Sequence, residues 1–140
     1  MEEKTYAEIK GNCPVYRTLK IMGKKWALDI VAELLCQGDK RRYNELQRAL
    51  VFVSPKVLSE RLKELEKAGI IKRKVYSKEI PVRVEYELTD KGSDFKEVIN
   101  CIKEWGDKWT YIGEHEDYCK LCNQWRKEFM KEQKSWQKLT

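Results

Sequence analysis

The stretch of sequence that decides the fold is SPKVLSERLKELEKAG, at residues 54–69. Ser54 can cap a helix by accepting a backbone N–H, and Pro55 suits the first helical position, where its missing donor costs nothing. Gly69 can take the left-handed conformation that often ends a helix. Apolar side chains recur at helical spacing on one face: Val57, Leu58, Leu62 and Leu65. The opposite face is polar: Lys56, Ser59, Glu60, Lys63 and Glu64.

A basic hairpin is predicted directly after this helix. Residues 71–76 form its first arm, and apolar and polar side chains alternate strictly along its second arm, residues 82–88. Pro81 ends the loop between the arms and prevents further pairing there. A capped helix followed by a basic hairpin indicates a winged helix, in which the helix at 54–68 would read DNA. For the helix alone, an ordinary amphipathic surface helix remains the alternative.

Three helices and a minimal strand are expected before this pair. Pro14 can start the first helix, and Gly23 ends it; its apolar side chains are Val15, Leu19 and Met22. The second helix covers about residues 26–35, and residues 40–43 can form a short strand. The third covers residues 43–50, with Asn44 as a plausible cap. Together with the helix at 54–68, it makes a helix-turn-helix arrangement.

A long helix is expected after the hairpin, capped by Thr89 and Asp90. Apolar side chains follow along it at helical spacing: Phe95, Val98, Ile99, Ile102, Trp105, Trp109 and Ile112. A small domain cannot cover such a stripe, so a second copy of the chain is its natural partner. The residues expected to form this homodimer contact are Val15, Leu19, Phe95, Val98, Ile102, Trp105 and Trp109. Residues 116–140 repeat a helical pattern.

Composition places the chain among soluble, single-domain proteins. A length of 140 residues suits one domain, and 41% hydrophobic residues support a core. No apolar run is long enough to span a membrane, and the first residues lack the pattern of a signal peptide. We therefore expect a cytoplasmic protein. Five cysteines, an odd count, argue against a framework of disulfides.

The positive charge is concentrated in one segment. Residues 40–91 carry fourteen basic and eight acidic side chains, and basic and acidic residues balance on either side, so this segment supplies the whole net charge of +6. A localised basic surface on the predicted helix and hairpin is typical of nucleic-acid binding. The alternative is a solvated lysine-rich face.

The chain resembles the HxlR family of bacterial and archaeal transcription regulators, which are winged-helix proteins akin to the MarR group. The matching stretches, in order, are CPV at 13–15, GKKW at 23–26, RYNEL at 42–46, VSPKVLSERLKELE at 53–66, PVRVEY at 81–86 and LTDKG at 88–92. The tail after Gly113 is longer than the family usually carries. The resemblance implies a mainly α fold with a small β hairpin (α+β), a winged helix-turn-helix domain with N- and C-terminal dimerisation helices. We expect a flexible arm at residues 1–12, this domain at 13–113 and a helical extension at 114–140.

The resemblance also implies a homodimer that reads a pseudo-palindromic operator in double-stranded DNA, with two reading helices about one helical turn apart. Candidate base contacts lie on the outer face of the helix at 54–68: Ser54, Lys56, Ser59, Glu60 and Lys63. Arg42 and Asn44 are expected at phosphates, and Lys78 and Arg83 on the wing at the backbone or minor groove. Lys72, Arg73 and Lys74 supply general attraction. For Arg61 we favour an internal ion pair, with Glu45 or Glu85.

The cysteines carry further hypotheses. Cys13 precedes the first helix, where the helix dipole favours a thiolate, and similar family members include sensors of oxidants and electrophiles. The alternative is a small packed residue at the dimer contact. His115, Cys119 and Cys122 have a spacing that could bind a metal or form a redox pair, but a structural zinc site usually needs a fourth ligand, so we expect no metal and no cofactor. Cys36 and Cys101 are expected in the core.

An enzyme is not expected. The sequence has no glycine-rich phosphate loop and no nucleophile elbow, and its single histidine lacks a clear catalytic partner. The alternative to a regulator that responds to an oxidant or small molecule is a protein-interaction module. Such a module would use the aromatic C-terminal helices and bind DNA without specificity.

Overall fold

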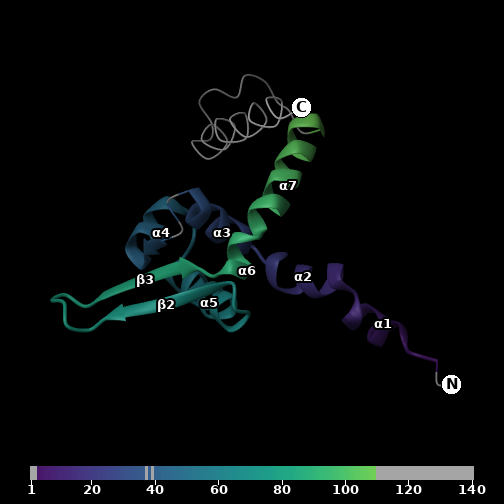
Figure 1. The fold of residues 1–140 in the computed structure, drawn as a ribbon, viewed down its shortest axis with the longest axis horizontal. Coiled ribbons are helices and arrows are strands. Elements are labelled where there is room, and N and C mark those ends of the chain that lie inside the picture. The colour runs from purple at the N-terminus through teal and green to yellow at the C-terminus, as the bar shows by residue number, and fades with distance from the viewer. Residues whose placement is uncertain (1–2, 37, 39, 110–140) are drawn as a thin grey trace, which may run out of the picture.

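The computed structural model describes residues 3–36, 38 and 40–109. Its elements follow in the order α1 (Tyr6–Asn12), α2 (Pro14–Met22), α3 (Ala27–Cys36), β1 (Lys40–Arg42), α4 (Tyr43–Ala49), α5 (Pro55–Lys67), β2 (Ile71–Tyr76), β3 (Arg83–Leu88), α6 (Asp90–Ser93) and α7 (Phe95–Trp109). Among these elements, none is a helix long and apolar enough to cross a membrane. The predicted fold class, mainly helical with a small sheet and a wing, is confirmed (Figure 1).

The sheet is antiparallel, in the order β1-β3-β2. Ile71 pairs with Leu88 at the base of the β2–β3 wing, and Lys40 of β1 pairs with Glu87 on the other edge of β3. Beneath the sheet lies the core, whose fully buried large side chains come from α3, α4, α5 and the start of β2: Ile30, Val31, Leu34, Leu46, Leu58, Leu62, Leu65 and Ile71.

Helix α5 has the ends that its sequence predicts. The side chain of Ser54 accepts a hydrogen bond from the Val57 N–H at 3.2 Å, and Pro55 is the first helical residue. Gly69 follows the helix with φ of +74°, in the left-handed region. The fixed ends and the buried leucine face hold the outer face of α5 toward solvent.

The LTDKG stretch fastens the end of α5 to the C-terminal helices. The hydroxyl of Thr89 accepts from the Gly92 N–H and lies within hydrogen-bond distance of the Ile70 carbonyl oxygen, at 3.1 Å. Lys91 Nζ donates to the carbonyl oxygen of Ala68 at 2.7 Å. Gly92 is buried against the same turn, where a Cβ atom would overlap the Ile70 carbonyl oxygen. The turn at residues 68–70 is therefore held by residues 89–92 through hydrogen bonds and close packing.

Several expectations about local structure need correction. The flexible arm expected at residues 1–12 contains helix α1, which starts with a capping box between Thr5 and Glu8. Asn44 is not the cap of α4: Arg42 holds that position, and Glu45 accepts its N–H at 3.4 Å. The helix expected after Thr89 is interrupted at Asp94, between α6 and α7.

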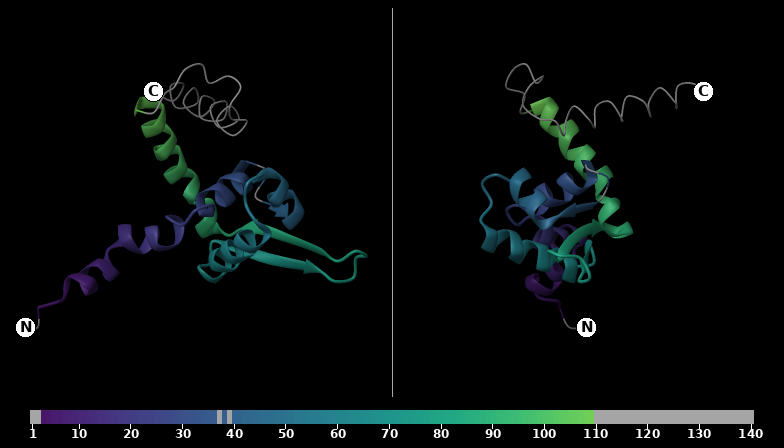
Figure 2. Two further views of the ribbon diagram at one scale, coloured as in Figure 1. Left: turned by 180° about the vertical axis from the view of Figure 1, so that it is seen from behind. Right: turned by 90° about the vertical axis from the view of Figure 1, so that its left-hand side faces the viewer.

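The two ends of the described chain project from the body of the domain. Helices α1 and α2 leave it on one side and α7 on another (Figures 1 and 2). Six of the seven predicted dimer residues are exposed on α2 and α7: Val15, Leu19, Val98, Ile102, Trp105 and Trp109. Phe95 differs, because it is half-buried against its own domain's core. Cys101 was expected in the core and is exposed, whereas Cys36 is buried as expected.

Candidate nucleic-acid interface

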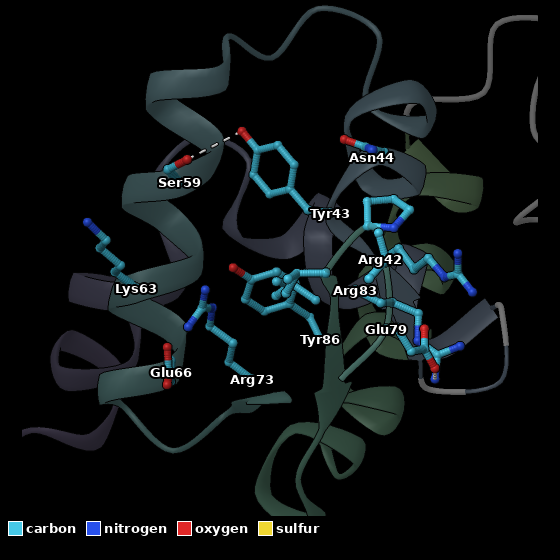
Figure 3. Close-up of a pocket in the computed structure, with 14 residues that line it drawn as sticks. Arg42, Tyr43, Asn44, Ser59, Lys63, Glu66, Arg73, Glu79, Arg83 and Tyr86 are labelled. Atoms are coloured by element: carbon cyan, nitrogen blue, oxygen red, sulfur yellow. Dashed lines mark hydrogen bonds and ion pairs between the residues drawn. The ribbon is translucent and has the colours of Figure 1, made fainter. Parts of the chain in front are cut away.

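Tyr43 joins the two helices of the helix-turn-helix. It is the first residue of α4, and its hydroxyl donates to the Pro55 carbonyl oxygen at 3.2 Å. The same hydroxyl lies 3.3 Å from Oγ of Ser59, one turn into α5 (Figure 3). The start of α4 is thereby fixed against the first half of α5.

The GKKW stretch anchors the other side of α5. Arg61 Nε donates to the Lys25 carbonyl oxygen at 2.9 Å, and its guanidinium pairs with Glu64 at 3.2 Å. Lys24 Nζ also pairs with Glu64, at 2.9 Å. The structural role favoured for Arg61 is confirmed, but the predicted partners are wrong, since Glu45 pairs with Arg41 instead.

Glu64→Gln is expected to lower stability modestly at neutral pH. The hydrogen bond from Lys24 lowers the pKa of Glu64, with a further contribution from Arg61. A carboxylate whose pKa is lower in the folded state than in the unfolded state stabilises the fold at pH values above the ordinary pKa of 4.5. This contribution is lost as the pH falls below 4.5 and Glu64 becomes protonated. Because the pair is partly exposed, the difference should be about 0.2–1 kcal/mol. Urea unfolding of both proteins at neutral and acidic pH measures it, and a difference that grows in acid would contradict this role.

A groove of about 810 Å³ separates α5 from the wing (Figure 3). It is lined by residues from α5, the start of α4 and the β2–β3 hairpin: Arg42, Tyr43, Asn44, Ser59, Lys63, Glu66, Arg73, Glu79, Ile80, Pro81, Val82, Arg83, Val84 and Tyr86. Five of the predicted contact residues meet here: Arg42, Asn44, Ser59, Lys63 and Arg83. The other four, Ser54, Lys56, Glu60 and Lys78, are exposed outside this lining.

The positive charges of the groove are only partly neutralised. Arg42, Lys63 and Arg73 line it and form no ion pair within the described part of the chain. On the wing, by contrast, Lys72 and Lys74 lie 3.7 and 3.6 Å from the carboxylate of Glu87. The cations without an internal partner in the described part of the chain therefore include three that line the groove.

Two side chains that are predicted to contact DNA already have partners within the chain. The hydroxyl of Ser59 is half-buried beside Tyr43. The guanidinium of Arg83 pairs with Glu79 at 3.2 Å and lies 4.1 Å from the centre of the Tyr76 ring.

Sequence reasoning missed part of the lining. The sequence patterns indicate no site role for Tyr43, Glu66 or Tyr86, and they predict only general attraction for Arg73. Arg73 pairs directly with Tyr86 across the hairpin, so both side chains share one face of the sheet. The predicted alternation on the second arm, carried across the hairpin, would have placed Arg73 on this face.

No metal site is assigned. Within residues 3–36, 38 and 40–109, no group of three histidine, cysteine or acidic side chains is placed to hold a metal ion. His115, Cys119 and Cys122 lie outside the described residues, as do Ile112 and the predicted extension at 114–140.

The model of the HxlR-like helix-turn-helix family matches residues 21–114. The chain belongs to the HxlR family. YvaP of Bacillus subtilis, described as an uncharacterized HTH-type transcriptional regulator, is 43% identical over 98 residues, which cover 69% of this chain and 88% of YvaP. This HxlR-family chain is therefore a transcriptional regulator with a helix-turn-helix DNA-binding domain.

Solved structures agree with this assignment. A protein described as a MarR-family transcriptional regulator, from Porphyromonas gingivalis W83, is similar with a TM-score of 0.64 and 34% identity, over 78% of this chain and 99% of that one. The reduced form of the regulator YodB from B. subtilis is similar with a TM-score of 0.62 and 34% identity, over 73% and 98% of the two chains. YodB has also been solved after diamide treatment and with bound quinone. The winged helix-turn-helix assignment is thus supported at the level of sequence and fold.

Proposed function

We propose that the protein binds operator DNA as a homodimer, with α5 in the major groove and the β2–β3 wing beside it. The observation that carries this proposal is the groove between α5 and the wing, where Arg42, Lys63 and Arg73 have no internal ion pair among the described residues. DNA is the partner that such cations fit best: phosphates suit Arg42 and Arg73 and dominate affinity, and Lys63 lies on the outer face of α5.

Sequence would be read by the exposed outer face of α5. Lys56 and Lys63 can donate to guanine, and Glu60 can accept from cytosine. Ser54 and Asn44 lie at the exposed starts of α5 and α4. Ser59 would reach a base only by giving up its contact with Tyr43. Arg42 and, on the wing, Lys78 would hold the phosphate backbone.

The homodimer would form through α2 and α7. Their exposed apolar side chains include Leu19, at 55% of its full exposure, and Trp105, at 62%. Two copies related by a twofold axis would cover these side chains and place two α5 helices on one face of a pseudo-palindromic site.

Mobility shift with DNA from upstream of the protein's own coding region tests the proposal. Binding that survives an excess of unrelated competitor DNA is expected for a regulator. Binding that competitor removes completely would favour the alternative, a protein-interaction module with only non-specific affinity for DNA.

We also infer that Cys13 makes the regulator responsive to oxidants or electrophiles. Cys13 is half-buried at the junction of α1 and α2, beside the exposed apolar side chains of α2. A bulky or oxidised sulfur there would disturb the dimer contact. YodB, with its diamide-treated and quinone-bound forms, supports the inference by likeness.

Cys13→Ser should bind DNA like the wild type and keep this binding after diamide or quinone treatment, whereas the wild type should lose it. Mobility shift before and after treatment measures this. Cys101→Ser is the matched control, because Cys101 is also a free cysteine but is exposed on α7. Equal loss of binding by the wild type and Cys13→Ser would remove Cys13 from the mechanism.

A further inference from the structure

Arg83 holds its guanidinium at the base of the wing loop. Its terminal nitrogen lies 3.2 Å from Oε1 of Glu79, and its carbon Cζ lies 4.1 Å from the centre of the Tyr76 ring. Both Arg83 and Glu79 line the groove beside α5. The side chain of Arg83 is only 25% exposed, whereas that of Glu79 is 48% exposed. The carboxylate is therefore the more solvent-exposed member of the pair.

The pairing leaves part of the guanidinium unused. Arginine has five N–H donors, and Nε of Arg83 is buried without a hydrogen-bond partner within the described structure. Carboxylate and phosphate both fit the guanidinium fork, because each presents two oxygens in the matching plane. In the free protein, Glu79 thus occupies a position that a DNA phosphate could take.

We infer that Arg83 and Tyr76 form a phosphate site in the wing that Glu79 keeps closed until DNA displaces its carboxylate. This inference rests on the proposed DNA binding and adds a competing internal ligand to it. The Tyr76 ring holds the guanidinium in place during the exchange. Each binding event then includes the opening of one ion pair, which weakens the attraction of the wing for DNA.

A double-mutant cycle on the full chain tests the competition. Wild type, Glu79→Gln, Arg83→Gln and the double variant are titrated with a fluorescein-labelled duplex from the protein's own upstream region, at several salt concentrations. Glu79→Gln should bind on the order of three-fold tighter, the range expected for releasing one partly exposed ion pair. Arg83→Gln should bind more weakly, with a salt slope shallower by about 0.9. In the Arg83→Gln background, Glu79→Gln should change affinity little.

Glu66→Gln is the matched control. Glu66 lines the same groove and forms no ion pair within the described residues, so its neutralisation relieves repulsion without opening a pair. Its effect should be the same with or without Arg83→Gln. If Arg83→Gln lowers the melting temperature, Arg83→Lys replaces it, since lysine keeps the charge and loses the fork.

Three outcomes would overturn the inference. Equal tightening by Glu79→Gln in both backgrounds would show simple charge repulsion. An unchanged salt slope in Arg83→Gln would exclude a phosphate at Arg83. If the wild type binds neither this duplex nor unrelated duplexes, the proposed DNA binding is overturned, and the inference with it.

Discussion

Replacing Trp105 and Trp109 together with alanine is expected to turn the proposed homodimer into a monomer. The two side chains are 62% and 66% exposed on α7, and no residue of that helix is fully buried, so the fold itself should survive. Truncation of a tryptophan at the centre of an interface commonly costs about 2 kcal/mol or more, which is a roughly 30-fold weaker association for each. DNA affinity should fall with the loss of the second reading helix.

Sedimentation velocity and circular dichroism, measured on the same samples, check this prediction. Ile80→Ala is the control, because it removes an apolar side chain that is 99% exposed on the wing, far along the chain from α7. It should sediment like the wild type. A double tryptophan variant that still sediments as a dimer would place the contact elsewhere.

Gly92→Ala is expected to destabilise the domain by about 1–3 kcal/mol, the range for overpacking a filled site. A Cβ atom at this position would overlap the Ile70 carbonyl oxygen and lie 2.9 Å from Cδ2 of Leu88. Backbone cannot yield as a flexible side chain does. To relieve this overlap, α6 would have to move away from the turn that ends α5. That movement would also break the hydrogen bonds that Thr89 forms with this turn.

Urea unfolding monitored by circular dichroism measures this loss. Gly11→Ala is the matched control: Gly11 lies inside α1, and nothing is within 4 Å of a Cβ added there. Alanine should be neutral or stabilising at that site, by up to about 1 kcal/mol. If Gly92→Ala unfolds at the same urea concentration as the wild type, the close contact described for this turn is wrong.

The sequence predicts elements well where the signals are local. Ser54, Pro55 and Gly69 act within their own turns, so the bounds of α5 could be read directly. Alternation on the second arm of the hairpin predicts β3 for the same reason. The capping box of α1, from Thr5 to Glu8, is also local, but α1 has only seven residues and none is buried, so its sequence pattern is too short to indicate a helix.

The predictions that were wrong depend on which distant segments of the chain come into contact. Arg61 binds the carbonyl of Lys25, 36 residues away, and no pattern of charges indicates a backbone acceptor. Phe95 and Ile99, near the start of α7, pack on the core, but Trp105 does not, because α7 projects away from the body of the domain (Figure 1). The pairing of Arg83 with Glu79 follows from the shape of the wing loop. The sequence therefore predicts which cations belong to the candidate site, but not which of them are paired with another residue of the chain.

DNA affinity of Lys63→Ala compared with that of Lys67→Ala tests the central claim most directly. Both lysines are exposed on α5, but only Lys63 lines the groove beside the wing. If α5 reads DNA through this face, Lys63→Ala should weaken binding of the upstream duplex by about 1–3 kcal/mol, and Lys67→Ala should change it little. Equal weakening by the two variants, or none by Lys63→Ala, would contradict the claim that the groove between α5 and the wing is the DNA-binding surface.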